Sequence, residues 1–200
     1  MKIQSALRSI DAMDTRIPEH TRWGLPIEGV EQRFWFEWQR NGGEQIAFDN
    51  SQGDVNSALV AYITASFDVK RIWLAPELAE FSEPLAQIPG SLVSIQMEPE
   101  NPGLFDLGIC SCELFLAETG TIAQGWHNQR PRAISLLPPN VIFIAKRTQI
   151  VAHLEDALEQ LPILSPNGWV WIGGPSRTAD IEKVLVKGIH GPKRTAILLL

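Results

Sequence analysis

The sequence predicts an α/β fold, in which a mostly parallel sheet is flanked by helices and preceded by a helical N-terminal arm. Short apolar runs alternate with amphipathic segments from residue 54 to residue 200. Runs such as VIFIA (141–145) and AILLL (196–200) are continuously apolar, which is typical of parallel strands buried on both faces. The chain has 200 residues, of which 44% are hydrophobic and 20% charged, and this fits one domain with a full core.

The N-terminal part differs in character from the rest of the chain. Residues 1–45 are expected to form N-terminal helices and an arm, and residues 46–200 the α/β core of the same domain. The spacing of apolar residues predicts helices over 1–13 and 30–40, separated by an irregular arm with proline and glycine among charges (14–30). The second helix is expected to end at an Asn-Gly-Gly turn.

Helices of the core are predicted where apolar residues recur every three or four positions. Leu154, Ala157, Leu158 and Leu161 follow this pattern closely. Pro76 suits the first turn of a helix, because its missing N–H costs little there. The predicted helices of the core are 54–66, 76–87, 153–161 and 178–187.

Strands of the core are predicted where short apolar runs lie between turn residues. The predicted strands are 45–48, 71–75, 92–96, 107–110, 114–117, 121–124, 141–145, 169–172 and 195–200. Because these strands alternate with helices, we expect βαβ units and a mostly parallel sheet. Ligands of such sheets bind outside the carboxyl ends of the strands, so the loops that follow strands are the first candidates for a site.

Composition and charge argue against several classes of protein. Lys and Arg number 17 against 23 Asp and Glu, and this net charge of -6 is unlike that of a protein that binds nucleic acid through a broadly basic face. No apolar run reaches the roughly 18–20 residues of a membrane span, and the first residues lack the features of a signal peptide, so a cytoplasmic location is expected. Cys110 and Cys112 are expected to be buried thiols, and no metal site is predicted.

The first candidate loop joins two apolar runs and contains Glu118, Thr119, Gly120 and Thr121. Gly120 can adopt a positive φ, which would turn backbone N–H groups towards a ligand beside the two threonine hydroxyls. Glu118 is then a candidate catalytic or ligand-orienting carboxylate. The alternative is a hairpin turn with a solvated glutamate.

The second candidate loop lies between a predicted strand and the predicted helix over 178–187. Gly174, Ser176, Arg177 and Thr178 would offer free N–H groups, hydroxyls and a guanidinium to a carboxylate or phosphate at the positive end of that helix. The alternative is ordinary capping of the helix. The loop has neither the lysine of a phosphate-binding P-loop nor a GxGxxG fingerprint.

The third candidate loop contains His190, between the end of the predicted helix over 178–187 and the last strand. His190 is a candidate proton donor or hydrogen-bond donor to a ligand, and the alternative is a histidine that caps the helix. Because this loop precedes a strand of a parallel sheet, we expect it at the opposite end of the sheet from the other two loops.

Four strings of residues together resemble the LutC/YkgG family, also called LUD-domain proteins. They are AETGTI (117–122), SLLPPNVIFIAK (135–146), GPSRTADIE (174–182) and GIHGPK (188–193). The resemblance covers roughly residues 54–200, and it identifies residues 1–200 as a single LUD-like domain. It implies a fold similar to the NagB/RpiA/CoA-transferase-like group. Analogy with CoA transferases would make Glu118 a nucleophile.

The resemblance implies a role in L-lactate utilisation, in which a component of this type acts with other components to oxidise lactate to pyruvate. Iron–sulfur clusters are expected on those partner proteins and no cofactor on this chain, with a small carboxylate or phosphate as ligand and no nucleic acid. Two other functions stay open. One is a free-standing enzyme of the CoA-transferase, sugar-phosphate isomerase or folate cyclo-ligase kind that uses Glu118. The other is a ligand-sensing or assembly module without catalysis.

Overall fold

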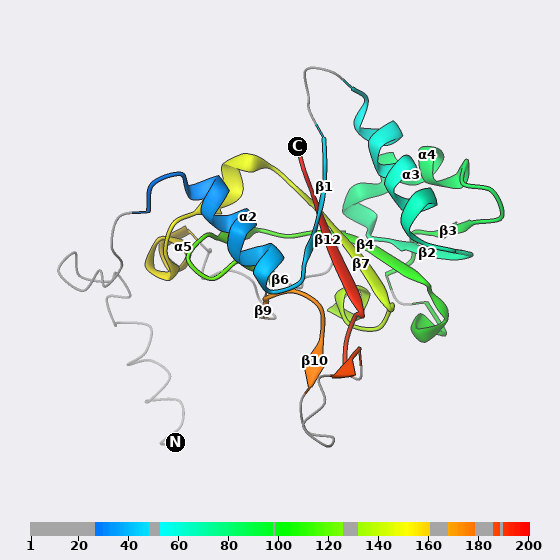
Figure 1. Cartoon of the computed structure of the whole chain (residues 1–200). Helices are drawn as coiled ribbons and strands as arrows, with labels where there is room; N and C mark the ends of the chain where they lie inside the picture. The colour runs from blue at the N-terminus through cyan, green and yellow to red at the C-terminus, as the bar shows by residue number, and fades with distance from the viewer. Residues whose placement is uncertain are drawn as a thin grey trace, which may run out of the picture.

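A computed structural model gives the structure of the chain (Figure 1). It describes residues 27–48, 53–97, 99–125, 132–160, 168–178, 186–188 and 190–200. The predicted helix over residues 1–13 and most of the predicted arm lie outside the described residues. No helix among the described residues is both long enough and apolar enough to cross a membrane.

The centre of the molecule is a six-stranded sheet in which every pair of neighbouring strands is parallel. From one edge to the other, its strands are β1 (Glu44–Ile46), β12 (Arg194–Leu199), β7 (Asn140–Ala145), β4 (Leu107–Ser111), β2 (Arg71–Leu74) and β3 (Leu92–Ser94). The predicted α/β class with a mostly parallel sheet is therefore confirmed. All six strands lie within two residues of their predicted bounds.

Side chains of the central strands alternate between two cores. In β7, Ile142 and Ile144 face one core, whereas Val141 and Phe143 face the other. The continuously apolar sequence of this strand follows from burial on both faces. The first core is closed by α3 (Val55–Ser66), the 3₁₀ helix η2 (Pro76–Phe81) and α4 (Ser82–Ala86).

The other face of the central sheet is covered by α2 (Val30–Arg40) and by a smaller mixed sheet. Phe34 and Trp38 of α2 are fully buried, and Phe34 packs edge-on against Phe115 at a ring distance of 5.0 Å. Residues 30–46 are therefore part of the core, and the expected boundary between residues 45 and 46 falls inside β1. The smaller sheet has the strand order β8 (Ile150–Val151), β5 (Leu114–Leu116), β6 (Thr121–Gly125) and β9 (Trp169–Ile172).

The remaining elements are short. Helix α5 (Leu154–Gln160) buries Ala157 against the outer face of the smaller sheet. Both cysteines are buried, as expected from the sequence. Three further 3₁₀ helices are η3 (Pro102–Leu104), η4 (Arg132–Ser135) and η5 (Arg147–Gln149).

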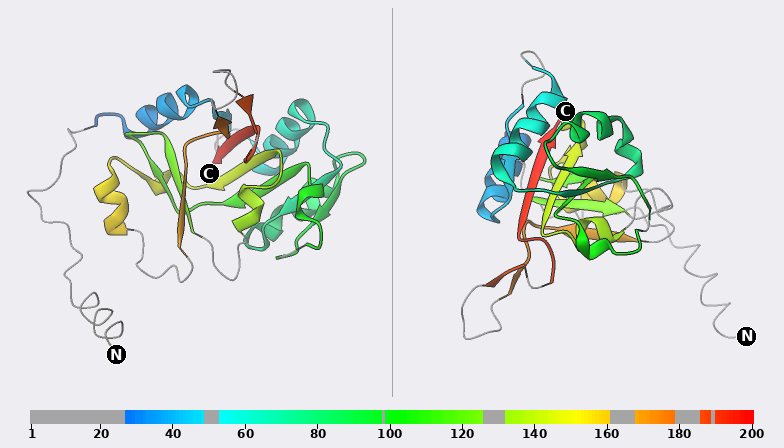
Figure 2. Two further views of the ribbon diagram at one scale, coloured as in Figure 1. Left: turned by 90° about the horizontal axis from the view of Figure 1, so that it is seen from below. Right: turned by 90° about the vertical axis from the view of Figure 1, so that its right-hand side faces the viewer.

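A continuous helix over 178–187, as predicted, is wrong, and residues 179–185 lie outside the described residues. Its ends lie in β10 (Arg177–Thr178) and β11 (Val186–Lys187), which pair antiparallel, with Thr178 opposite Val186. A continuous helix rises about 1.5 Å per residue and would hold these two ends more than ~10 Å apart. Figure 2 shows this ribbon standing away from both sheets.

The predicted helix over 76–87 is divided into η2 and α4. Leu78 has a φ of -114°, which is outside the helical range. Pro84 inside the segment has no N–H to donate and its ring crowds the preceding turn, so a single regular helix is disfavoured.

Candidate functional site

Glu118 lies in the turn between β5 and β6, and its carboxylate is held at the start of α5. One oxygen lies 2.9 Å from His153 Nδ1, and the other accepts the Leu154 N–H at 3.1 Å. Glu118 N–H donates to the Ala152 carbonyl at 3.1 Å. The side chains of Glu118 and His153 are 31% and 17% exposed, so the pair is partly shielded from solvent. His153 is not among the candidate residues identified from sequence, although it is the first residue of the predicted helix over 153–161, which is a usable signal.

Gly120 has a φ of 62° and allows the turn to lie directly on the backbone of α2. A Cβ at this position would stand 2.5 Å from the Glu37 carbonyl carbon, and closer still to Trp38 N. The Gly120 N–H donates to the Leu116 carbonyl at 2.9 Å, so it serves the turn itself. Beside it, the hydroxyls of Thr119 and Thr121 are 2.7 Å apart.

Asn41, just after α2, connects the first candidate loop to the second. Its side-chain amide donates to the Thr119 carbonyl at 2.8 Å. Its own carbonyl accepts a hydrogen bond from the Arg177 guanidinium. Gly174 has a φ of 110°, and a Cβ there would stand 2.9 Å from the same carbonyl oxygen. From the sequence, Asn41 is predicted only as the end of a helix, because no local pattern signals contacts this distant in the chain.

The second and third candidate loops are also adjacent. Ser176 N–H donates to the Pro192 carbonyl at 2.8 Å, and the Ser176 carbonyl accepts Gly188 N–H at 3.0 Å. The expectation that these loops lie at opposite ends of the sheet is therefore wrong. The reason is that β9 belongs to the smaller sheet and continues into the β10–β11 ribbon, which returns the chain to the start of β12.

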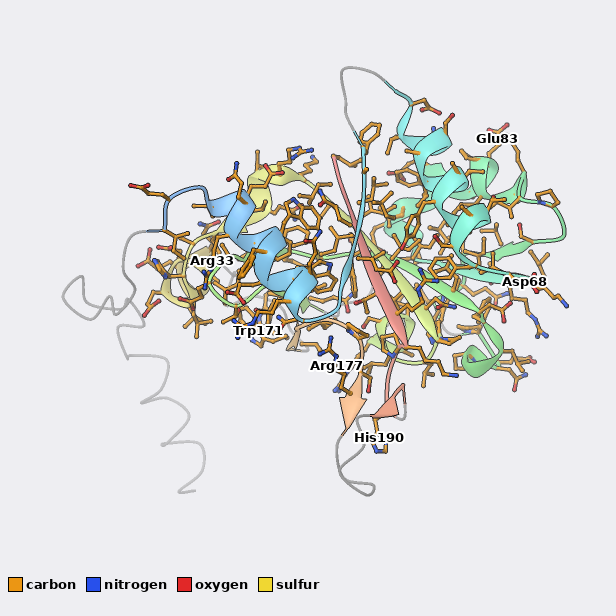
Figure 3. All side chains as sticks on the ribbon, in the orientation of Figure 1. Arg33, Asp68, Glu83, Trp171, Arg177 and His190 are labelled. Atoms are coloured by element: carbon orange, nitrogen blue, oxygen red, sulfur yellow. The ribbon has the colours of Figure 1, made fainter. Side chains whose placement is uncertain are left out.

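We use the term loop cluster for residues 41–43, 119–121, 173–177 and 190–193. It lies at the amino ends of β1 and β12, since residues 41–43 and 190–193 lead directly into these strands. Figure 3 shows Arg177 and His190 on this side of the molecule, next to the β10–β11 ribbon, and His190 is exposed. Thr178 follows the cluster in β10.

The loop cluster has a chemistry suited to small anions. It gathers the Arg177 guanidinium, the Lys193 ammonium and the hydroxyls of Thr119, Thr121 and Ser176. A guanidinium and hydroxyl groups are common partners of carboxylates and phosphates. The expected dipole of a helix starting at residue 178 contributes nothing, because residues 177–178 form a strand. The described residues contain no group of three or more His, Cys, Asp or Glu side chains that could hold a metal ion.

A cluster of charged side chains fixes the two strands that begin beside the loop cluster. Arg194 of β12 makes two hydrogen bonds of 2.7 Å to the carboxylate of Glu44 in β1. Tyr62 donates to the same carboxylate at 2.8 Å, and the Arg194 guanidinium lies 4.4 Å from the centre of the Phe67 ring. The hydrogen bonds to Glu44 raise the pKa of Arg194. The pKa of Tyr62 is also raised, mainly by burial and secondly by its hydrogen bond to Glu44.

Comparison with known proteins gives a match to the LUD domain family over residues 100–200, which include all four strings named above. A lactate utilization protein C from Exiguobacterium sp. is 40% identical over 101 residues, covering 48% of this chain and 44% of that protein. Lactate utilization protein C 1 from Bacillus mycoides is 38% identical over 101 residues, covering 48% and 43%. The match thus spans less than half the length of these curated relatives.

A crystal structure of a DUF162 family protein from Deinococcus radiodurans has a similar fold, with a TM-score of 0.62. The superposition covers 87% of this chain and 99% of that chain at 17% sequence identity. At this identity the similarity establishes the fold alone, so the chemistry of the site is argued from the residues of the loop cluster.

Proposed function

The chain belongs to the LUD-domain family, and from this premise we propose that it is a component of a lactate-utilisation system that binds a small carboxylate at the loop cluster. The named relatives support the metabolic role. The convergence of three motif loops supports the site, because Asn41 bonds both to Thr119, 78 residues away in sequence, and to Arg177, 136 residues away.

The carboxylate of lactate is expected to bind the Arg177 guanidinium, which would exchange its bond to the Asn41 carbonyl for a charge-assisted pair. The hydroxyls of Thr119, Thr121 and Ser176 would accept or donate hydrogen bonds to the remaining oxygens of the ligand. Gly174 keeps the loop close to Asn41. His190, exposed on the neighbouring loop, is the proposed hydrogen-bond donor to the ligand.

Oxidation of lactate to pyruvate releases a pair of electrons together with protons, so an electron acceptor is required. We propose that iron–sulfur partner proteins accept the electrons and that this chain supplies the anion site or a docking surface. A free-standing enzyme is the second candidate function, and the 2.9 Å pairing of Glu118 with His153 favours it, because a histidine oriented by a carboxylate is a common acid–base device.

Thermal-shift and calorimetric binding measurements would test the anion site. The ligands are L-lactate, pyruvate, phosphate, sugar phosphates, CoA and folates, each with the wild type and with Arg177→Ala. Arg71→Ala is a matched control, because this exposed arginine begins β2, which β7 and β4 separate from β12. Arg177→Lys keeps the charge and removes the planar fork.

We expect lactate or pyruvate to stabilise the wild type and Arg71→Ala, and to have much less effect on Arg177→Ala. Stabilisation by CoA, sugar phosphates or folates alone would support the free-standing enzyme. Equal stabilisation of all variants would place the ligand elsewhere and contradict the proposed site. If no ligand binds at millimolar concentration, the anion site is refuted and an assembly module is the better description.

A further inference from the structure

The direction in which the chain adds strands to the central sheet reverses between β2 and β4. Within this sheet, the strand that follows β2 is β3, at one edge, whereas the strand that follows β4 is β7, on the other side, although β2 and β4 are paired neighbours. Connections that depart in opposite directions leave a crevice beyond the carboxyl ends of the two strands, where ligands of open α/β sheets bind. The loop cluster is at the amino ends of β1 and β12, so it does not occupy this position.

A groove is present at the carboxyl ends of these strands. Its volume is about 630 Å³, within the range of small-molecule sites of about 300–1,000 Å³. Leu78, Phe81, Leu114 and Ile144 give it an apolar lining, and all four side chains are buried. The other residues that line it are Glu80, Ser111, Cys112, Glu113, Ala145, Lys146, Gln149, Gln160 and Leu200.

Hydrogen bonds hold the walls of the groove in place. The Gln149 amide donates to the carbonyls of Cys112 and Glu113, both at 2.8 Å, and its oxygen accepts the Lys146 N–H at 2.6 Å. Ser111 donates to a Glu77 carboxylate oxygen at 2.9 Å. The ends of β4 and β7 are thereby tied to each other and to η2, so the groove is formed before a ligand binds.

The charges on the lining favour an anionic group. In the part of the chain that the structure describes, Lys146 has no ion pair. Glu113, by contrast, accepts the Gly125 N–H at 2.7 Å, which directs its carboxylate towards the smaller sheet. Glu80 and Lys146 are both exposed, so water screens both charges and the pairing of an anion with Lys146 is expected to be weak. A cation next to an apolar floor suits a ligand with a carboxylate at one end and a hydrocarbon body.

We propose that this groove binds a small amphipathic monocarboxylate, with its hydrocarbon body against Leu78, Phe81 and Ile144 and its carboxylate paired with Lys146. This site is separate from the loop cluster and carries no part of the proposed lactate site. The two differ in chemistry, because the loop cluster offers hydroxyls and a guanidinium whereas the groove offers mainly apolar surface.

The experiment uses the full chain with isotope-labelled Ile, Leu and Val methyl groups, titrated with octanoate in NMR spectra and by calorimetry. Saturable shifts are expected at Leu78, Leu114 and Ile144, and none at Leu59 or Ile63, which lie in the core under α3. Octylamine is the control ligand of opposite charge, and it is expected to bind more weakly than octanoate.

Two variants separate this site from the loop cluster. Lys146→Met is expected to weaken octanoate binding about two- to fivefold, the range for an ion pair at an exposed position. Arg177→Ala is expected to leave the octanoate-induced shifts at Leu78, Leu114 and Ile144 unchanged. Loss of these shifts in Arg177→Ala would overturn the groove proposal while leaving the lactate site intact. The proposal would also fail if octanoate does not saturate at millimolar concentration, if the shifts lie elsewhere, or if octylamine binds as tightly as octanoate.

Discussion

Replacement of Gly120 by alanine tests whether the turn between β5 and β6 is shaped by its contact with α2. Two effects of this substitution are separable. The φ of 62° is a left-handed conformation that costs an L-residue about 1–2 kcal/mol. The new methyl group would also stand 2.5 Å from the Glu37 carbonyl carbon, which requires the turn or α2 to move.

Overpacking of this kind costs about 1–3 kcal/mol, so the total expected destabilisation of Gly120→Ala is about 2–5 kcal/mol. Two other glycines are internal controls. Gly90 has a φ of 76° with nothing within 4 Å of its added Cβ, so Gly90→Ala incurs only the backbone strain of about 1–2 kcal/mol. Gly103 has equal space and no positive φ, so Gly103→Ala is expected to be neutral or slightly stabilising.

Urea unfolding followed by tryptophan fluorescence measures all three variants. With a slope of about 1–3 kcal/mol per molar urea, Gly120→Ala is expected to lower the midpoint by at least ~0.7 M. The expected order of stability is Gly103→Ala, then Gly90→Ala, then Gly120→Ala. If Gly120→Ala is no less stable than Gly90→Ala, the close approach of the turn to α2 is not what requires glycine there.

Two further predictions concern side chains beside the loop cluster. Burial and the Glu44 contact raise the pKa of Tyr62 above its ordinary value of 10.0, so the stability that neutral Tyr62 contributes is complete below pH 10.0 and is lost as the pH rises above it. Because the chain has one tyrosine, phenolate absorbance reports the ionisation of Tyr62 alone. Glu44→Gln should lower the midpoint of this ionisation, whereas an unchanged midpoint would contradict the assigned contact. The Thr195 hydroxyl is buried without a hydrogen-bond partner in the described structure, so Thr195→Val is expected to raise the urea midpoint by the equivalent of about 1–3 kcal/mol, and a loss of stability would show that the hydroxyl is satisfied.

The central sheet could be predicted from the sequence because burial on both faces leaves a local signal. VIFIA and AILLL are apolar at every position, as expected of strands that are buried on both faces. The segment over 178–187 shows the limit of such reasoning. Its apolar spacing is helical, but the pairing of Arg177 with Lys187 depends on the path of the chain, which spacing does not encode.

The candidate site could be predicted only in part, for a similar reason. Glu118, Arg177 and His190 are proposed from the sequence because each lies within three residues of a glycine in a motif string. Asn41 and His153 are missed because their roles depend on contacts over 78 and 35 residues of sequence, to Thr119 and Glu118 respectively. Local patterns identify which loops carry chemistry, whereas the partners that orient each loop come from tertiary structure.

The environment of Glu118 changes how its substitution should be interpreted. A carboxylate that accepts hydrogen bonds on both oxygens must give up at least one of them to attack a substrate, so the geometry favours Glu118 as the group that orients His153. Loss of activity in Glu118→Gln would therefore not identify a nucleophile by itself. If Glu118 acts through His153, His153→Asn should lose as much activity as Glu118→Gln, and the double variant little more. If Glu118 is the nucleophile, His153→Asn should keep much of the activity that Glu118→Gln abolishes.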